Sequence, residues 1–163
     1  MVFGRFSRMN REFGSKIDQA GSAEKPLIQV IDDDLRIRQG LKLYLQKAYR
    51  IRLCPTGEEG INTVDANVSV VILDIKMPGK NGLQVYDAIK AKFPDLPIIF
   101  YSAYQSVLEG AELSRKYRPF NYIDKSANVQ ELIDTVERAV NYAQTLRTLV
   151  NTERRLQEVR KKL

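Results

Sequence analysis

The sequence contains no histidine, and this absence restricts the chemistry open to the protein. Imidazole is the side chain that most often binds catalytic metals and takes up protons near neutral pH. Mechanisms that rely on a histidine triad or on a histidine-based metal centre are therefore excluded. Any chemistry must depend on carboxylates, lysine, hydroxyl groups and a bound cation.

Cysteine and long apolar runs are also scarce. Cys54 is the only cysteine in the sequence, which excludes an internal disulfide and a zinc site built from several thiolates. Because free cysteine is usually buried, we expect Cys54 to be a small core residue. No apolar run approaches the ~18 to 20 residues that span a bilayer, and charges interrupt the N-terminal stretch where a signal peptide needs apolar residues. We expect a cytoplasmic protein.

The formal net charge of +6 is unevenly distributed along the chain. Residues 27–137 contain 14 basic and 15 acidic residues, whereas residues 138–163 contain 7 basic and 2 acidic residues. A nucleic-acid-binding domain usually carries its basic surface on the folded part of the chain. We therefore do not expect nucleic acid to be a partner.

Apolar segments alternate with segments of helical periodicity from Leu27 onward. This alternation predicts an α/β fold with a doubly wound parallel sheet and helices on both faces. The near-continuous apolar run at 68–75 is typical of a central strand that is covered on both sides. The expected strands are 27–31, 51–54, 68–75, 96–103 and 120–124. The expected helices are 35–50, 56–64, 82–93, 106–117 and a long helix from Asn128 onward.

The two ends of the chain differ from this central part. Residues 1–26 are polar and contain scattered glycines, so we expect a flexible or weakly helical arm before a domain at 27–140. Residues 141–163 form a helical extension in which an apolar or aromatic residue recurs every seven positions. This spacing predicts about three heptads of a coiled coil that supports a homodimer or binds a partner. A long solvated helix is the alternative. The repeat consists of Tyr142, Leu149, Leu156 and Leu163, with Ala139 and Leu146 at the companion positions.

Polar side chains follow four of the expected strands. Asp32 and Asp33 end the first strand, Asp74 lies near the end of the third, Ser102 near the end of the fourth and Lys125 just past the fifth. The carboxyl ends of parallel strands meet at one edge of a sheet, so these groups should converge. Two carboxylates ~4 Å apart repel by roughly 4 kcal/mol at an effective dielectric near 20. The cluster therefore needs Lys125 and a hard cation such as Mg²⁺ or Mn²⁺.

A carboxylate in this setting can act as a nucleophile toward a phosphoryl group. A cation and an ammonium would neutralise the incoming oxygens, and a hydroxyl group would donate to one of them. We expect Asp74 to form an acyl phosphate in this way. We expect Asp34, next to the cluster, to cap the following helix.

Four segments that carry these residues follow one another in a fixed order: VIDDD (30–34), VILDIKMPGKNG (71–82), IIFYSA (98–103) and YIDK (122–125). Together they resemble the receiver domain of bacterial two-component response regulators, over about residues 27 to 140. The resemblance implies a flavodoxin-like sheet with strand order 2-1-3-4-5. It also implies that Asp74 takes a phosphoryl group from the phosphohistidine of a sensor histidine kinase or phosphotransfer protein.

The resemblance also implies a role for each of the remaining residues. Ser102 and Lys125 would bind the phosphoryl oxygens, and Ser102 and Tyr122 would form the switch that responds to phosphorylation. Ser126 departs from the family, which usually has proline at this position. The expected ligands of Mg²⁺ are the carboxylates of Asp32, Asp33 and Asp74 and the backbone carbonyl of Lys76.

Other functions remain open at this point. An Mg²⁺-dependent aspartyl-phosphate phosphatase shares the nucleophilic aspartate, but it usually has a second acid where this chain has Lys76. A scaffold that acts without phosphorylation would keep the fold and lose the chemistry. As an enzyme, the protein is expected at most to phosphorylate and dephosphorylate itself at Asp74. The output of the signal, and whether a longer protein contains this chain, do not follow from the sequence.

Overall fold

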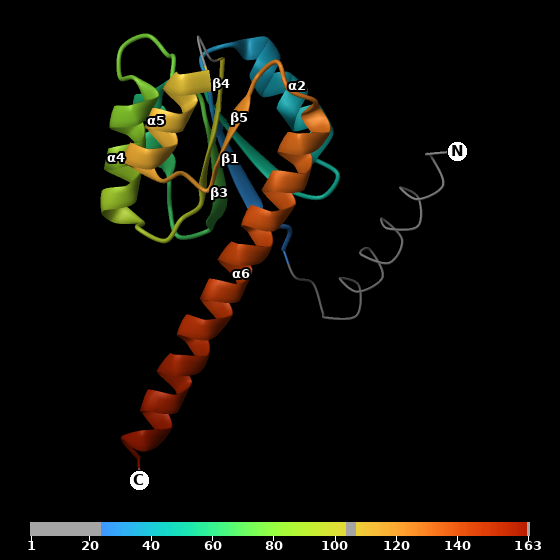
Figure 1. Cartoon of the computed structure of the whole chain (residues 1–163). Helices are drawn as coiled ribbons and strands as arrows, with labels where there is room; N and C mark the ends of the chain where they lie inside the picture. The colour runs from blue at the N-terminus through green and yellow to red at the C-terminus, as the bar shows by residue number, and fades with distance from the viewer. Residues whose placement is uncertain (1–23, 104–106, 163) are drawn as a thin grey trace.

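A computed structural model describes residues 24–103 and 107–162, which form a five-stranded parallel sheet flanked by helices (Figure 1). The strands are β1 (Leu27–Ile31), β2 (Arg50–Cys54), β3 (Val68–Leu73), β4 (Ile98–Ser102) and β5 (Asn121–Asp124). The helices are α2 (Leu35–Leu45), α3 (Gly57–Thr63), α4 (Gly82–Lys92), α5 (Val107–Tyr117) and α6 (Val129–Arg160).

The strand order is β2-β1-β3-β4-β5, and every neighbouring pair is parallel. This is the doubly wound α/β fold that the alternating pattern and the resemblance predicted. All residues of β1 and β3 are buried, which fits strands covered on both faces. Because all five strands are parallel, their carboxyl ends lie at the same edge of the sheet.

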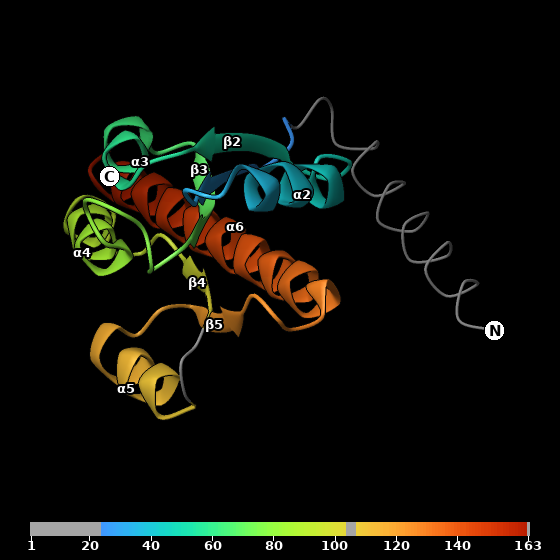
Figure 2. The same ribbon diagram turned by 90° about the horizontal axis from the view of Figure 1, so that it is seen from above.

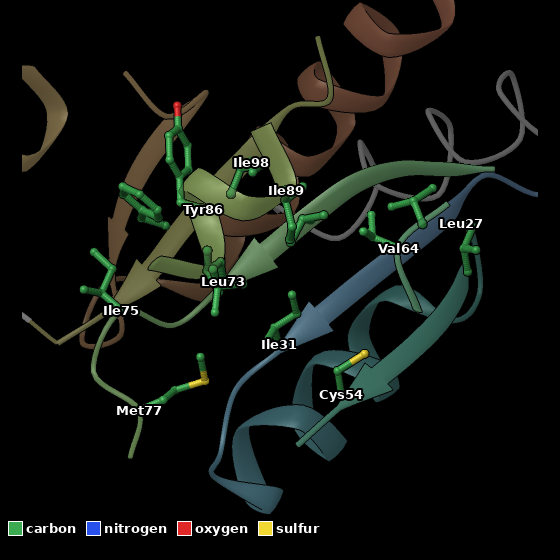
Figure 3. Close-up of a cluster of buried hydrophobic side chains, with 14 residues drawn as sticks. Leu27, Ile31, Cys54, Val64, Leu73, Ile75, Met77, Tyr86, Ile89 and Ile98 are labelled. Atoms are coloured by element: carbon green, nitrogen blue, oxygen red, sulfur yellow. The ribbon is translucent and has the colours of Figure 1, made fainter. Parts of the chain in front are cut away.

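Helices cover both faces of the sheet (Figure 2), and a cluster of apolar side chains lies on each face. On one face, side chains of α3, α4 and α5 pack against alternate residues of the strands, including Ile31, Leu73 and Ile98 (Figure 3). On the other face, α2 and α6 pack against the intervening residues, such as Val30 and Ile72. The alternation of side chains along each strand thus supplies both cores. Cys54 is fully buried in the first layer, as expected.

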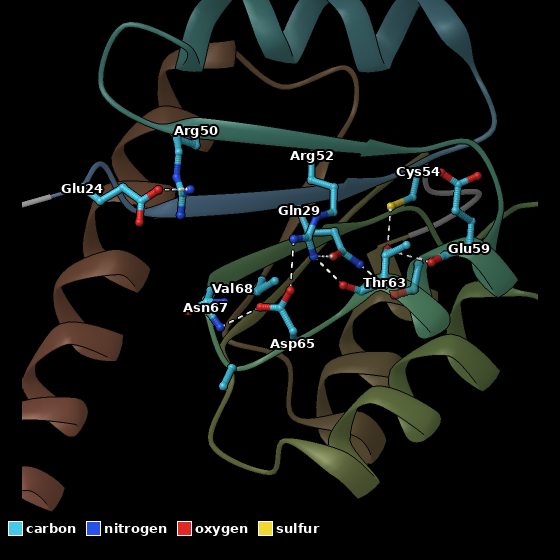
Figure 4. A network of polar contacts seen from close by, with 12 residues as sticks. Glu24, Gln29, Arg50, Arg52, Cys54, Glu59, Thr63, Asp65, Asn67 and Val68 are labelled. Atoms are coloured by element: carbon cyan, nitrogen blue, oxygen red, sulfur yellow. Dashed lines mark hydrogen bonds and ion pairs between the residues drawn. The ribbon is translucent and has the colours of Figure 1, made fainter.

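One polar side chain, Gln29, is fully buried in the central part of the sheet (Figure 4). Its Nε2 donates to the carbonyl of Gly60 at 2.8 Å, and its Oε1 accepts from Arg52 at 3.2 Å. The second guanidinium nitrogen of Arg52 pairs with Asp65 at 3.0 Å. Because its amide is satisfied on both sides, Gln29 joins β1 to β2 and α3 without an unpaired buried group.

The helix expected at 35–50 ends earlier than the sequence pattern suggested. α2 stops at Leu45, where the backbone N–H of Gln46 donates to the carbonyl of Lys42. Ala48, which falls within the expected helix, lies in the following turn and is exposed. The chain needs this turn because it must reverse direction before β2, which begins at Arg50. The helical spacing of apolar residues continues past Leu45, so the sequence pattern did not indicate this reversal of the chain.

α6 is one continuous helix that extends well beyond the sheet (Figure 1). Its first half packs on the domain, and Ala139 is fully buried there, so this companion position of the predicted heptads belongs to the core. At the amino end of β3, the Nη2 of Arg147 donates to the carbonyls of Ala66 at 2.9 Å and Val68 at 2.8 Å. The helix is thus attached to the domain beyond the predicted boundary at residue 140.

Some expectations fall on parts of the chain that are not described. The N-terminal arm was predicted over residues 1–26, of which 1–23 lie outside the described residues, as does Leu163 of the heptad repeat. Within the described ranges, no helix has the length and apolar character needed to cross a membrane.

α4 begins in very close contact with the turn that follows β3. The N–H of Gly82 donates to the carbonyl of Ile75 at 2.9 Å. A Cβ atom on Gly82 would lie 2.5 Å from the Cα of Ile75 and would also collide with the carbonyl oxygen of Asp74. Both neighbours are backbone atoms, so the contact requires glycine at this position.

Replacement of Gly82 by alanine should destabilise the protein by at least about 2 kcal/mol, because the rigid backbone at Asp74 must shift. Gly40→Ala is a matched control: Gly40 lies in α2, and a Cβ atom added to it would have no neighbour within 4 Å. This change should stabilise the protein by about 0.5–1 kcal/mol through helix propensity. Urea unfolding measures both. Equal effects of the two substitutions would contradict the close contact.

Candidate functional site

Polar residues from four segments meet at the carboxyl edge of the sheet. Asp32 follows β1, Asp74 follows β3, Ser102 is the last residue of β4 and Lys125 follows β5. The strand pairing explains the convergence, since Ile31 is aligned with Leu73 and Ser102 is aligned with Asp124. Ligand sites of open parallel sheets form at this edge.

Asp74 is the centre of the cluster, and its side chain is almost completely buried. One carboxylate oxygen, Oδ1, accepts a hydrogen bond from the hydroxyl of Ser102 at 2.6 Å and from the backbone N–H of Lys76 at 3.1 Å. The other oxygen, Oδ2, lies 2.8 Å from the Nζ of Lys125. Both oxygens are therefore held in place by donors.

Lys125 bridges two buried carboxylates. Its Nζ lies 2.7 Å from Oδ2 of Asp32 and 2.8 Å from Oδ2 of Asp74. Burial acts to lower the pKa of Lys125, but the hydrogen bonds to the two aspartates outweigh this effect and raise the pKa above its ordinary value. Lys125 is therefore a cation at neutral pH. Burial raises the pKa of Asp32, and the contact with Lys125 counteracts only part of this effect.

The loop between β1 and α2 orders the acidic residues. The other oxygen of Asp32, Oδ1, accepts from the backbone N–H of Asp34 at 2.9 Å. Asp34 caps α2, as expected, by accepting from the N–H of Arg36 at 2.8 Å. Hydrogen bonds from Arg36 lower the pKa of Asp34 to about 2. Asp34 is thus committed to the helix terminus and is separate from the cluster.

Arg38 supports this loop from inside the protein, and sequence analysis did not identify it. Its guanidinium is buried and donates to the backbone carbonyl of Asp32 at 2.6 Å. In the sequence, Arg38 looks like a residue on the polar face of an amphipathic helix. Only its place one turn into α2, directly behind the aspartate loop, distinguishes it from a surface charge.

The carboxylates of Asp32, Asp33 and Asp74 could hold a metal ion. One oxygen from each lies within 4.8 Å of the others, and Asp33 is exposed at the mouth of the cluster. Carboxylate oxygens without histidine or cysteine suit a hard dication such as Mg²⁺. The donor set therefore fits the ion that the sequence suggested. The backbone carbonyl of Lys76 was predicted as a further ligand. Lys76 lies beside the cluster, as the hydrogen bond from its backbone N–H to Asp74 shows.

The two predicted switch residues lie in neighbouring strands. Ser102 is fully buried, whereas Tyr122 is half-buried and packs edge-on against Phe100 with ring centroids 5.9 Å apart. Phe100 also contacts Tyr86 of α4 at 5.2 Å and Tyr117 of α5 at 6.5 Å. Sequence analysis missed this aromatic cluster, because the contacts join residues from separate elements.

Ser126 occupies the position where proline was expected. Its backbone N–H donates to the carboxylate of Asp124 at 2.7 Å, and its hydroxyl contacts the same oxygen. Proline has no N–H and could not donate this bond. The loop that carries Lys125 is therefore stabilised in this protein by a local hydrogen-bonded turn.

Comparisons with known proteins agree with this arrangement. Residues 28–137 match the family described as the response regulator receiver domain. The DNA-binding transcriptional regulator NtrC of Escherichia coli (strain K12) is 34% identical over 125 residues, which are 74% of this chain and 26% of that protein. The chain therefore spans about a quarter of the length of this relative.

Two similar solved structures are receiver domains. The crystal structure of a response regulator receiver domain protein from Clostridium thermocellum has a TM-score of 0.67 and 28% identity, over 74% of this chain and 98% of the other. The BeF3-activated DrrB receiver domain has a TM-score of 0.66 and 26% identity, over 72% and 98% of the two chains. Together with the family match, the fold and the acidic edge of the sheet, these similarities show that the chain belongs to the response regulator receiver domain family, the phosphoacceptor signalling domains of two-component systems.

Proposed function

We propose that Asp74 is the phosphoacceptor, and that it takes the phosphoryl group from the phosphohistidine of a sensor histidine kinase or phosphotransfer protein in the presence of Mg²⁺. One observation supports this assignment above the others. Asp74 is the carboxylate that contacts both Ser102 and Lys125, the two groups able to bind phosphoryl oxygens. Its carboxylate oxygen would attack phosphorus as the P–N bond to the donor histidine breaks, and the product is an acyl phosphate.

Each neighbouring residue has a specific part in this step. The ammonium of Lys125 would exchange its contact with Asp74 for one with a phosphoryl oxygen, while its contact with Asp32 keeps it in place. The hydroxyl of Ser102 would turn from Asp74 to donate to a second phosphoryl oxygen. Mg²⁺, held by Asp32, Asp33, Asp74 and the carbonyl of Lys76, would supply positive charge to the phosphoryl oxygens. Mn²⁺ suits the same ligands.

The signal would leave the site through Ser102 and Tyr122. When the hydroxyl of Ser102 moves toward the phosphoryl group, the space beside β4 changes, and Tyr122 would turn inward from its place against Phe100. Because Phe100 also contacts Tyr86 and Tyr117, the change would reach the surfaces of α4 and α5. We propose that these surfaces, together with α6, control partner binding or dimerisation.

The relative NtrC is described as a DNA-binding transcriptional regulator, but this chain matches only 26% of that protein. In this chain, residues 27–137 carry balanced charges, so we assign signal reception and not nucleic-acid binding to the matched part. An aspartyl-phosphate phosphatase usually has a second acid at the position of Lys76. Lysine cannot replace that acid, so this function is disfavoured. A scaffold without phosphorylation would not need donors on both oxygens of Asp74.

The phosphoacceptor role can be tested with acetyl phosphate and Mg²⁺, followed by intact-mass measurement. The protein should gain one phosphoryl group, and Asp74→Asn should gain none. Asp33→Asn should require at least about tenfold more Mg²⁺ because one ligand charge is lost. Asp87→Asn, which changes an exposed carboxylate on α4, is the control and should behave like the unchanged protein. Phosphorylation of Asp74→Asn at the normal rate would refute the assignment.

The charge balance of the site predicts a link between Lys125 and metal binding. Lys125→Met should destabilise the metal-free protein by about 2–4 kcal/mol, because it leaves the buried carboxylates of Asp32 and Asp74 without their shared cation. Saturating Mg²⁺ should reduce this loss, since the ion supplies positive charge to the folded state alone. Urea unfolding with Mg²⁺ and with EDTA measures both effects.

Lys42→Met is the control for this experiment, because it removes an exposed lysine from the last turn of α2. It should change the unfolding free energy by less than about 0.5 kcal/mol, with or without Mg²⁺. If Lys125→Met were as mild as Lys42→Met in EDTA, Lys125 would not neutralise the aspartates.

A further inference from the structure

The part of α6 beyond the domain carries large apolar side chains on its surface. Leu149 and Leu156 are 60% and 57% exposed, and Tyr142 is 46% exposed. Figure 1 shows this half of the helix projecting away from the sheet. A helix with an uncovered apolar stripe is marginal in water unless that stripe packs against another surface.

The domain covers only the start of the stripe, where Tyr142 contacts Phe120, because most of the stripe lies on a different side of the helix. At 100° per residue, the buried residues Val136, Ala139 and Ala143 mark the side of α6 that faces the sheet. Tyr142, Leu146, Leu149 and Leu156 are centred about 100° away from this side. We call these four residues the α6 stripe. It therefore lies on the flank of α6, roughly at right angles to the side that packs on the domain.

The charges on α6 indicate what kind of partner fits the α6 stripe. The positions that flank the stripe are uncharged: Thr145, Val150, Thr152, Gln157 and Val159. Most charges lie on the opposite side: Arg147, Arg154, Arg155, Glu158 and Lys161. The stripe itself is interrupted by one acid, Glu153, and one base, Arg160, so it has no net charge. Such a surface offers no counter-charge to a strongly charged partner, and it suits a second copy of itself.

We propose that two copies of the chain pair through the α6 stripe as an antiparallel coiled coil. A parallel pair in register would place Glu153 opposite Glu153 and Arg160 opposite Arg160, so that like charges face each other within an apolar seam. An antiparallel pair centred at Asn151 avoids both contacts. This inference rests on the proposed dimerisation through α6 and adds its geometry; it does not depend on phosphoryl transfer.

The antiparallel arrangement gives every seam residue a suitable neighbour. Leu146 of one copy faces Leu156 of the other, and Leu149 faces the aliphatic stem of Glu153. Arg160 faces the ring of Tyr142, a favourable cation–π pair. Tyr142 already contacts Phe120 with ring centroids 5.7 Å apart, so the end of the second helix meets an aromatic surface on the domain. All of these residues lie within the described part of α6 and the segment before β5.

Disulfide cross-linking distinguishes the two orientations. In a Cys54→Ala background, Leu146→Cys and Leu156→Cys are prepared separately, one of them with an affinity tag, and are oxidised alone and mixed. In the antiparallel pair, positions 146 and 156 are opposite, within the ~7 Å that a disulfide needs between Cα atoms. Identical positions are displaced by about 15 Å along the helix. The mixture should yield at least about tenfold more cross-linked dimer than either variant alone.

The opposite result, with each variant cross-linking to itself, would establish a parallel pair and overturn the proposal. Light scattering over a range of concentrations provides an independent readout. Leu156→Gln should weaken dimerisation at least about tenfold, while Arg155→Gln, which changes the adjacent residue on the polar side, should leave it unchanged. A monomer at every concentration would also overturn the proposal. These measurements use unphosphorylated protein without Mg²⁺, so their failure leaves the test of Asp74 unaffected.

Discussion

The ammonium of Lys125 lies between the carboxylates of Asp32 and Asp74, and the geometry of the site depends on this contact. Both carboxylates are nearly inaccessible to water, so their charges would be costly without a shared cation. The ammonium also ties the loop after β5 to the ends of β1 and β3. The same contact keeps Asp74 in reach of its donors before any phosphoryl group arrives. Charge neutralisation and positioning are thus achieved by one side chain.

Residues outside the cluster fix the positions of Asp32, Asp74 and Lys125. Arg38 fixes the carbonyl of Asp32, Gly82 allows α4 to start against the backbone of Asp74, and Ser126 closes the turn next to Lys125. Each of these contacts involves at least one backbone atom. The carboxylates therefore keep their positions even though three of them converge, and Asp33 is the exposed member of the cluster.

Most of the fold could be predicted from the sequence, because the spacing of apolar residues directly indicates which side chains are buried. The alternation of strands and helices, the cap at Asp34 and the convergence of Asp32, Asp74, Ser102 and Lys125 were all accessible from local patterns. The end of α2 at Leu45 was missed, since the reversal before β2 is set by tertiary packing and the helical pattern of the sequence continues past that point. Arg38 and the contacts of Phe100 were missed for a related reason. They join residues whose proximity arises only when separate elements pack together.

The attachment of Arg147 to the carbonyls of Ala66 and Val68 has a mechanical consequence. α6 starts beside the phosphoacceptor edge, just after the Lys125 loop, and crosses the sheet to this second attachment at the opposite edge. About 27 Å of helix lie before Arg147 and about 20 Å after it. Because the half of α6 before Arg147 is packed against the sheet, the projecting half is the stiff continuation of a segment that is held along its length. A small rotation of the packed half would therefore displace the projecting half by a distance that grows along the helix beyond Arg147.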